Sequence, residues 1–206
     1  MNILAVADEV DRRLYGGSLK DRMAPDIILG CGDVPGHYLD YLVSQLDAPL
    51  YAIHGNHDAP PATDGAQEFE TSGASWIGGR TARVKGLLLA GFDGSVRYNN
   101  GAYQSSQYQM DFAVRSIVPW LWLNKIRYGR FLDILVTHAP PRGIHDQSDP
   151  AHAGFSAFRW LIETFQPRYH VHGHVHVYDR RNVCITRVGR TEVVNVYPYR
   201  ELTLAI

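Results

Sequence analysis

Short apolar runs recur along the chain, and most of them end at a glycine or a polar residue. Continuous apolar runs of about four to eight residues are typical of strands that are buried on both faces. The runs predict strands at 3–7, 26–29, 49–53, 131–137 and 202–204, an extended stretch at 169–176, and hairpins spanning 81–92 and 182–196. Residues 59–75 are rich in Ala, Pro, Thr, Gly and Ser, which indicates a loop.

Three segments have the spacing of helices, and they lie between the predicted strands. The predicted helices span 37–45, 110–129 and 156–165. Pro119 should kink or split the second of them, because proline removes a helical hydrogen bond. Strands that alternate with helices, without an internal repeat or an interdomain linker, predict one α/β or α+β domain over residues 1–206.

The composition excludes several classes of protein. The chain has 206 residues, 45% of them hydrophobic, which suffices to bury a core. Its formal net charge of -1 does not favour nucleic acid as a partner, although a local site can still bind it. No signal peptide is visible and no apolar run reaches the roughly 20 residues of a membrane span. We therefore expect a cytoplasmic protein without a membrane partner.

Residues that bind metals or move protons follow five of the apolar runs. They are Asp8, Gly32-Asp33, Gly55-Asn56-His57-Asp58, Thr137-His138 and Gly173-His174-Val175-His176. Carboxylates, imidazoles and carboxamides bind hard or borderline divalent metals, and imidazoles also exchange protons near neutral pH. Ligands of α/β proteins gather at the carboxyl ends of strands. Taken alone, Asp8 is explained equally well as a turn or cap residue, but the later fragments favour a metal ligand.

In this order, D…GD…GNHD…H…GHxH, the fragments resemble those of the calcineurin-like metallophosphoesterases, and they span residues 8–176. The resemblance implies a four-layer α/β/β/α sandwich with its site at the C-terminal ends of the strands. It implies six metal ligands: Asp8, Asp33, Asn56, His138, His174 and His176, with Asp33 bridging two ions. It also implies that His57 is the general acid and that Asp58 orients the ring of His57.

By the same resemblance, the protein hydrolyses a phosphodiester or a phosphomonoester. Two divalent ions, manganese or iron with zinc as a further candidate, would clamp the phosphate and supply a bridging hydroxide. The expected partner is a small phosphoester. Two alternatives stay open: a one-metal, weakly active or inactive regulatory protein that binds a phosphate ligand, and a metal-dependent nuclease. The near-neutral charge argues mildly against the nuclease.

One position departs from the family pattern. The first motif of the family reads D-x-H and both residues bind the first ion, whereas the third position here is Val10. The neighbouring acids Glu9 and Asp11 do not have the family's spacing. By the resemblance, the first ion therefore keeps only Asp8, Asp33 and His176 as ligands. We expect its site to bind metal more weakly than the second.

Other residues have two interpretations each. His54 is expected to serve packing or to support the site, and His170 and His172 are expected to be hydrogen-bonded structural histidines. Trp120, Trp122 and Tyr128 are expected to be core or interface anchors. Residues 98–109 and the loop that carries Arg142 and His152 either face the substrate or form plain surface. Because alternate residues of an extended chain face one way, His174 and His176 are expected to reach one metal cluster.

Overall fold

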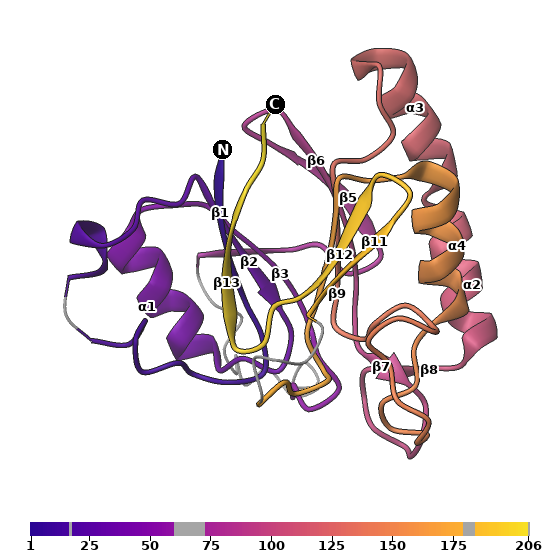
Figure 1. The fold of residues 1–206 in the computed structure, drawn as a ribbon, viewed down its shortest axis with the longest axis horizontal. Coiled ribbons are helices and arrows are strands. Elements are labelled where there is room, and N and C mark those ends of the chain that lie inside the picture. Colours follow the sequence, from indigo (N-terminus) through magenta and orange to yellow (C-terminus); the bar gives the residue numbers. More distant parts are fainter. Residues whose placement is uncertain (17, 60–72, 179–183, 206) are drawn as a thin grey trace, which may run out of the picture.

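Two sheets lie face to face, and helices lie on both outer sides (Figure 1). The computed structural model describes residues 1–16, 18–59, 73–178 and 184–205. The first sheet has the strand order β13-β1-β2-β3-β4. Its strands are β1 (Asn2–Val6), β2 (Ile27–Cys31), β3 (Leu50–Ile53), β4 (Ala74–Trp76) and β13 (Tyr199–Thr203). Four of them run parallel, and β13 closes one edge antiparallel to β1.

The second sheet has the strand order β11-β12-β10-β9-β6-β5. Its strands are β5 (Arg80–Val84), β6 (Leu87–Phe92), β9 (Ile134–Thr137), β10 (Tyr169–His172), β11 (Ile185–Val188) and β12 (Thr191–Asn195). The four central strands are parallel and both edge strands are antiparallel. A separate short pair is formed by β7 (Ser95–Val96) and β8 (Gln104–Ser105). Parallel central strands end at the same edge of a sheet, which gathers the residues that follow them.

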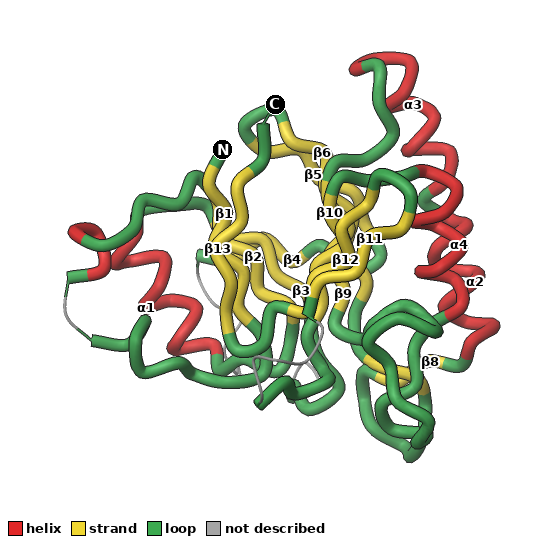
Figure 2. Tube along the Cα trace, viewed as in Figure 1, coloured by secondary structure: helices red, strands yellow, loops and turns green. Residues whose placement is uncertain are grey.

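Helices complete the layers, as Figure 2 shows. On the outer side of the first sheet lie the 3-10 helix η1 (Leu19–Asp21) and α1 (Gly36–Leu46). Outside the second sheet lie α2 (Gln107–Ser116), α3 (Val118–Tyr128) and α4 (Ser156–Phe165). One apolar cluster fills the space between the sheets, and one more lies under the helices on each side. The predicted α/β/β/α sandwich is confirmed, because strands that are apolar on both faces need cover on both.

The structure confirms the split expected at Pro119 and corrects two other details of the predicted elements. The helix predicted over 110–129 is divided between α2 and α3, with Pro119 in the first turn of α3, where a missing N–H costs nothing. Of the loop predicted at 59–75, residues 60–72 lie outside the described residues, and its predicted end is too late, because pairing with β3 draws Ala74 into β4. The extended stretch predicted to reach residue 176 ends at His172. The first residues of the hairpin predicted at 182–196 lie outside the described residues.

In the described part of the chain, no helix has the length and apolarity to cross a membrane.

Candidate metal centre

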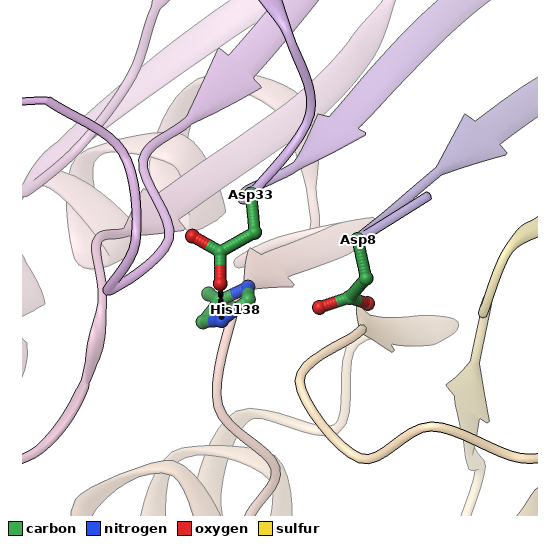
Figure 3. A group of neighbouring side chains, drawn as sticks. All are labelled: Asp8, Asp33 and His138. Atoms are coloured by element: carbon green, nitrogen blue, oxygen red, sulfur yellow. Dashed lines mark ion pairs between the residues drawn. The ribbon is translucent and has the colours of Figure 1, made fainter. Parts of the chain in front are cut away.

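Five of the six predicted ligands follow strand ends that the two sheets bring together. Asp8, Asp33 and Asn56 follow β1, β2 and β3, which are neighbours in the first sheet. His138 and His174 follow the neighbouring strands β9 and β10 of the second sheet. Figure 3 shows Asp8, Asp33 and His138 reaching one region from three different strands. One ligand atom of each lies within 4.8 Å of the others.

Three of these residues adopt backbone conformations that are rare outside glycine. The φ angle is 66° at Asp8, 55° at Asp33 and 67° at His174. Such conformations cost free energy at a residue with a Cβ atom and are concentrated at functional sites. At His174 the turn ends the extended chain, so the expected alternation of His174 with His176 is wrong. Instead, the turned backbone lets His174 N–H donate to both oxygens of Asp8, at 3.1 and 3.0 Å.

Three other predicted ligands approach the Nε2 atom of His138. It lies 3.1 Å from Asp33 Oδ2, 3.0 Å from Asn56 Oδ1 and 3.1 Å from His174 Nδ1. Ligands about 2.1 Å from a common ion lie roughly 3.0–3.4 Å from one another in octahedral or tetrahedral geometry. Each of the three distances to His138 Nε2 therefore matches the separation of neighbouring ligands of one divalent ion.

Hydrogen bonds at the far side of each imidazole set which nitrogen faces the centre. His138 Nδ1 lies 2.9 Å from the carbonyl oxygen of Cys31, and His174 Nε2 lies 2.6 Å from that of Ala151. When each of these nitrogens donates its proton to the carbonyl, the other nitrogen keeps a lone pair for a metal.

Burial and charge act in opposite directions on the central pair. Burial opposes ionisation of Asp33, but its hydrogen bond to His138 and the charge of that imidazole lower the pKa of Asp33. Burial also opposes protonation of His138, but the hydrogen bond and charge of Asp33 raise the pKa of His138 to about 9. Burial lowers the pKa of His174 to about 4.

The sixth predicted ligand, His176, lies at the edge of this cluster. Its Nε2 atom is 3.8 Å from Asp8 Oδ1. The Tyr197 ring stacks on the His176 ring at 4.5 Å with an interplanar angle of 13°, and His176 Nδ1 lies 2.9 Å from the Tyr178 hydroxyl. The nearby Asp8 carboxylate raises the pKa of His176. The residues predicted for the first ion, Asp8, Asp33 and His176, are here called the second donor set, and within it His176 approaches Asp8.

The residues around Val10 do not complete that second set. Val10 packs against the apolar cluster under α1. The Glu9 carboxylate accepts a hydrogen bond from the Tyr197 hydroxyl, and the Asp11 carboxylate forms an ion pair with Arg13 at 2.6 Å. Neither acid takes the place of the family's histidine. This agrees with the sequence, in which neither acid has the family's spacing.

The two residues predicted to be catalytic lie in the tight turn after β3. The His57 ring is exposed, and the His57 N–H donates to Asp33 Oδ1 at 2.7 Å. Asp58 Oδ2 instead accepts the N–H of Gly55 at 2.7 Å and the N–H of Asp33 at 3.1 Å. Among the described contacts, none joins the Asp58 carboxylate to the His57 ring. The orienting contact predicted for Asp58 is therefore replaced by one that holds the turn.

Two supporting residues have no signal in the sequence that identifies them. The Asn56 Nδ2 donates to the Tyr98 hydroxyl at 3.2 Å, which directs Asn56 Oδ1 toward His138. Tyr98 lies in segment 98–109, which was expected either to face the substrate or to form plain surface. Here its hydroxyl supports the predicted ligand Asn56. Ala151 contributes a carbonyl, which any residue type can provide. Both contacts are long-range, so only the folded chain reveals them.

The structural roles predicted for three other histidines agree with their contacts. The His54 ring is stacked between Trp76 and Tyr103, at 4.0 and 4.4 Å. His170 and His172 are buried, and His170 Nε2 lies 2.8 Å from Thr137 Oγ1.

The loop after β9 places one of its two candidate phosphate contacts near the centre. The His152 ring lies 5.3 Å from that of His174 and pairs with Asp149 at 3.0 Å, whereas Arg142 is exposed.

Comparisons with known proteins agree with this geometry. The family model described as calcineurin-like phosphoesterase matches residues 6–178. A solved structure of the protein TT1561 from Thermus thermophilus has 15% identity, covers 95% of this chain and 88% of that chain, and gives a TM-score of 0.60. A hypothetical protein from the same organism has 13% identity, with 95% and 75% covered and a TM-score of 0.53. A third structure has 18% identity, with 98% and 94% covered and a TM-score of 0.66. No curated protein matches.

Proposed function

Because the chain belongs to the calcineurin-like phosphoesterase family, we propose that it is a metal-dependent hydrolase of phosphodiesters or phosphomonoesters. One observation carries the proposal: Asp33, Asn56 and His174 approach a single nitrogen of His138 at 3.0–3.1 Å. Carboxylate, carboxamide and imidazole donors together suit manganese or iron, with zinc as a further candidate. When bound, such ions polarise phosphate oxygens and lower the pKa of a bound water, so that hydroxide forms near neutral pH.

The residues of the chain take separate roles in this proposal. Asn56, His138 and His174, together with Asp33, hold one ion. Asp8 and His176 hold the other and share Asp33 with the first. The backbone N–H of His57 donates to Asp33, and the exposed His57 ring donates a proton to the departing oxygen. Asp58 contributes by holding the turn that presents His57 and Asn56.

A single filled site is the second candidate function. It is favoured by Val10, which packs into an apolar cluster, and by the second donor set, in which His176 Nε2 lies 3.8 Å from Asp8 Oδ1. In that case the protein binds a phosphate ligand through one ion and is weakly active or inactive. A nuclease acting on long polyanions is less favoured, because the formal net charge of the chain is -1.

The first test combines metal content with activity. Purified protein is analysed for bound metal and is assayed on bis(4-nitrophenyl) phosphate and 4-nitrophenyl phosphate after manganese, iron or zinc is supplied. Asp33→Asn should lose both metal and activity, because Asp33 contributes to both donor sets. Asp21→Asn, a matched change at an exposed carboxylate of η1, should alter neither. Full metal content and turnover in Asp33→Asn would refute the two-ion assignment.

A further inference from the structure

The outer face of α3 is apolar although its inner face already packs on the protein. Leu121 is buried in the cluster beneath α2, α3 and α4. On the opposite side, Trp120 is 58%, Trp122 54% and Ile126 80% exposed, and Leu123 is 38% exposed. Of the ten large hydrophobic side chains that are exposed in the described part of the chain, four lie on this one helix. A surface helix normally presents polar residues outward, so this concentration indicates a surface that is covered in use.

Unpaired cations surround this apolar face. Arg127 lies on α3 itself, and Arg80, Arg83 and Lys85 lie on or beside β5, the edge strand next to it. Arg83 lies over the ring of Tyr128 at 4.8 Å, and Arg80 lines a hollow of about 400 Å³ together with Trp120, which joins β5 to α3. Within the described ranges, none of these four cations forms an ion pair.

The acids of this region, by contrast, are already paired with arginines. Asp111 pairs with Arg115, and Asp133 pairs with Arg130. The charge that remains around the apolar face of α3 is therefore positive. A second copy of the chain would bring the same cations against these ones, whereas an anionic surface would complement them.

We propose that the outer face of α3 docks on an anionic lipid surface. The apolar side chains enter the boundary between headgroups and acyl chains, and the surrounding cations contact lipid phosphates. Tryptophan suits this boundary because its ring is apolar and its N–H is polar. The expectation of no membrane partner followed from the lack of a spanning run, but a helix that lies on a membrane needs none.

The position of α3 leaves the metal centre accessible in this orientation. In Figure 1, α3 lies at the top of the view, which is the end of the molecule at which β1 begins. Asp8, Asp33 and His138 follow the other ends of β1, β2 and β9. A protein docked through α3 therefore keeps the donor cluster on the side away from the lipid. The inference does not depend on the proposed hydrolysis.

Vesicle binding tests the proposal with the whole chain. The protein is mixed with phosphatidylcholine vesicles, or with vesicles in which about a third of the lipid is phosphatidylglycerol, and bound protein is measured by sedimentation. Binding should require the anionic lipid, shift tryptophan fluorescence to shorter wavelength, and weaken when salt rises from about 0.05 to about 0.5 M. Ile126→Glu should weaken binding by about tenfold or more, because a charge replaces an inserted apolar group.

Matched controls separate docking from folding and from self-association. Ile185→Glu makes the same change at an exposed isoleucine of β11 and should bind vesicles like the unmodified protein. Circular dichroism should show both variants folded. Absence of binding to anionic vesicles, or equal binding by Ile126→Glu, would overturn the proposal. A dimer in light scattering that Ile126→Glu dissociates would also overturn it, and would assign the face to a second copy of the chain.

Discussion

Substitutions at Asp58 can distinguish a structural role in the turn after β3 from a catalytic role in orienting His57. The Asp58 Oδ2 atom accepts two backbone N–H groups, from Gly55 at 2.7 Å and from Asp33 at 3.1 Å. If this is its role, Asp58→Ala should destabilise the fold and loosen the donor cluster. Asp58→Asn should be tolerated, because the carboxamide oxygen can accept both hydrogen bonds.

The expected size of the effect follows from these contacts. Hydrogen bonds to a charged group contribute about 1.5–3 kcal/mol each, so two amount to about 3–6 kcal/mol. Burial raises the pKa of Asp58, which means that its charge carries a desolvation cost that offsets part of this sum. We expect Asp58→Ala to lower the free energy of unfolding by about 2–4 kcal/mol and Asp58→Asn to change it by less than about 1 kcal/mol.

Urea unfolding followed by circular dichroism measures both variants against the unmodified protein, and manganese titration measures the donor cluster. Asp58→Ala should bind manganese more weakly, in step with its lower stability. The structural account fails if Asp58→Ala unfolds at the same urea concentration as the unmodified protein. It fails completely if that variant loses turnover alone, since this is the behaviour of a carboxylate that orients His57.

Two further predictions concern single positions near the centre. Titration calorimetry should find that the set containing Asn56, His138 and His174 fills at lower metal concentration than the other, and that Val10→His tightens the weaker site; two equally tight sites that ignore this change would contradict the assignment. His57→Ala should keep its metal, because the backbone N–H to Asp33 remains, but should lose about 10²–10⁴-fold in rate on an alkyl phosphoester and less on a nitrophenyl ester. Equal losses on the two esters would remove the general-acid role.

Much of the fold was predictable because the strands are buried on both faces. β2 and β9 are buried along their whole length and read as continuous apolar runs. β4 has no buried residue and consists of three residues held by pairing with β3, so its own pattern does not indicate a strand. Helix α4 matched its predicted range because its apolar side chains recur at helical spacing and pack in one cluster.

The donor residues were predictable from their positions after strands, but their supports were not. The contact from Asn56 to Tyr98 spans 42 positions, and the one from Glu9 to Tyr197 spans 188. No local pattern encodes either pair. Asp58 was predicted to contact the His57 ring because the two residues are adjacent in the sequence, and adjacency does not fix where a side chain points. The tight turn at Gly55, where a Cβ would meet Asp33, turns the Asp58 carboxylate toward backbone N–H groups instead.

The central claim is that Asp33, Asn56, His138 and His174 hold one divalent ion. Crystals grown with manganese and measured for anomalous scattering test it most directly. We predict an anomalous peak about 2.0–2.4 Å from Asp33 Oδ2, Asn56 Oδ1, His138 Nε2 and His174 Nδ1. Manganese found only at other residues, or no peak at this cluster although the crystals contain the metal, would contradict the account.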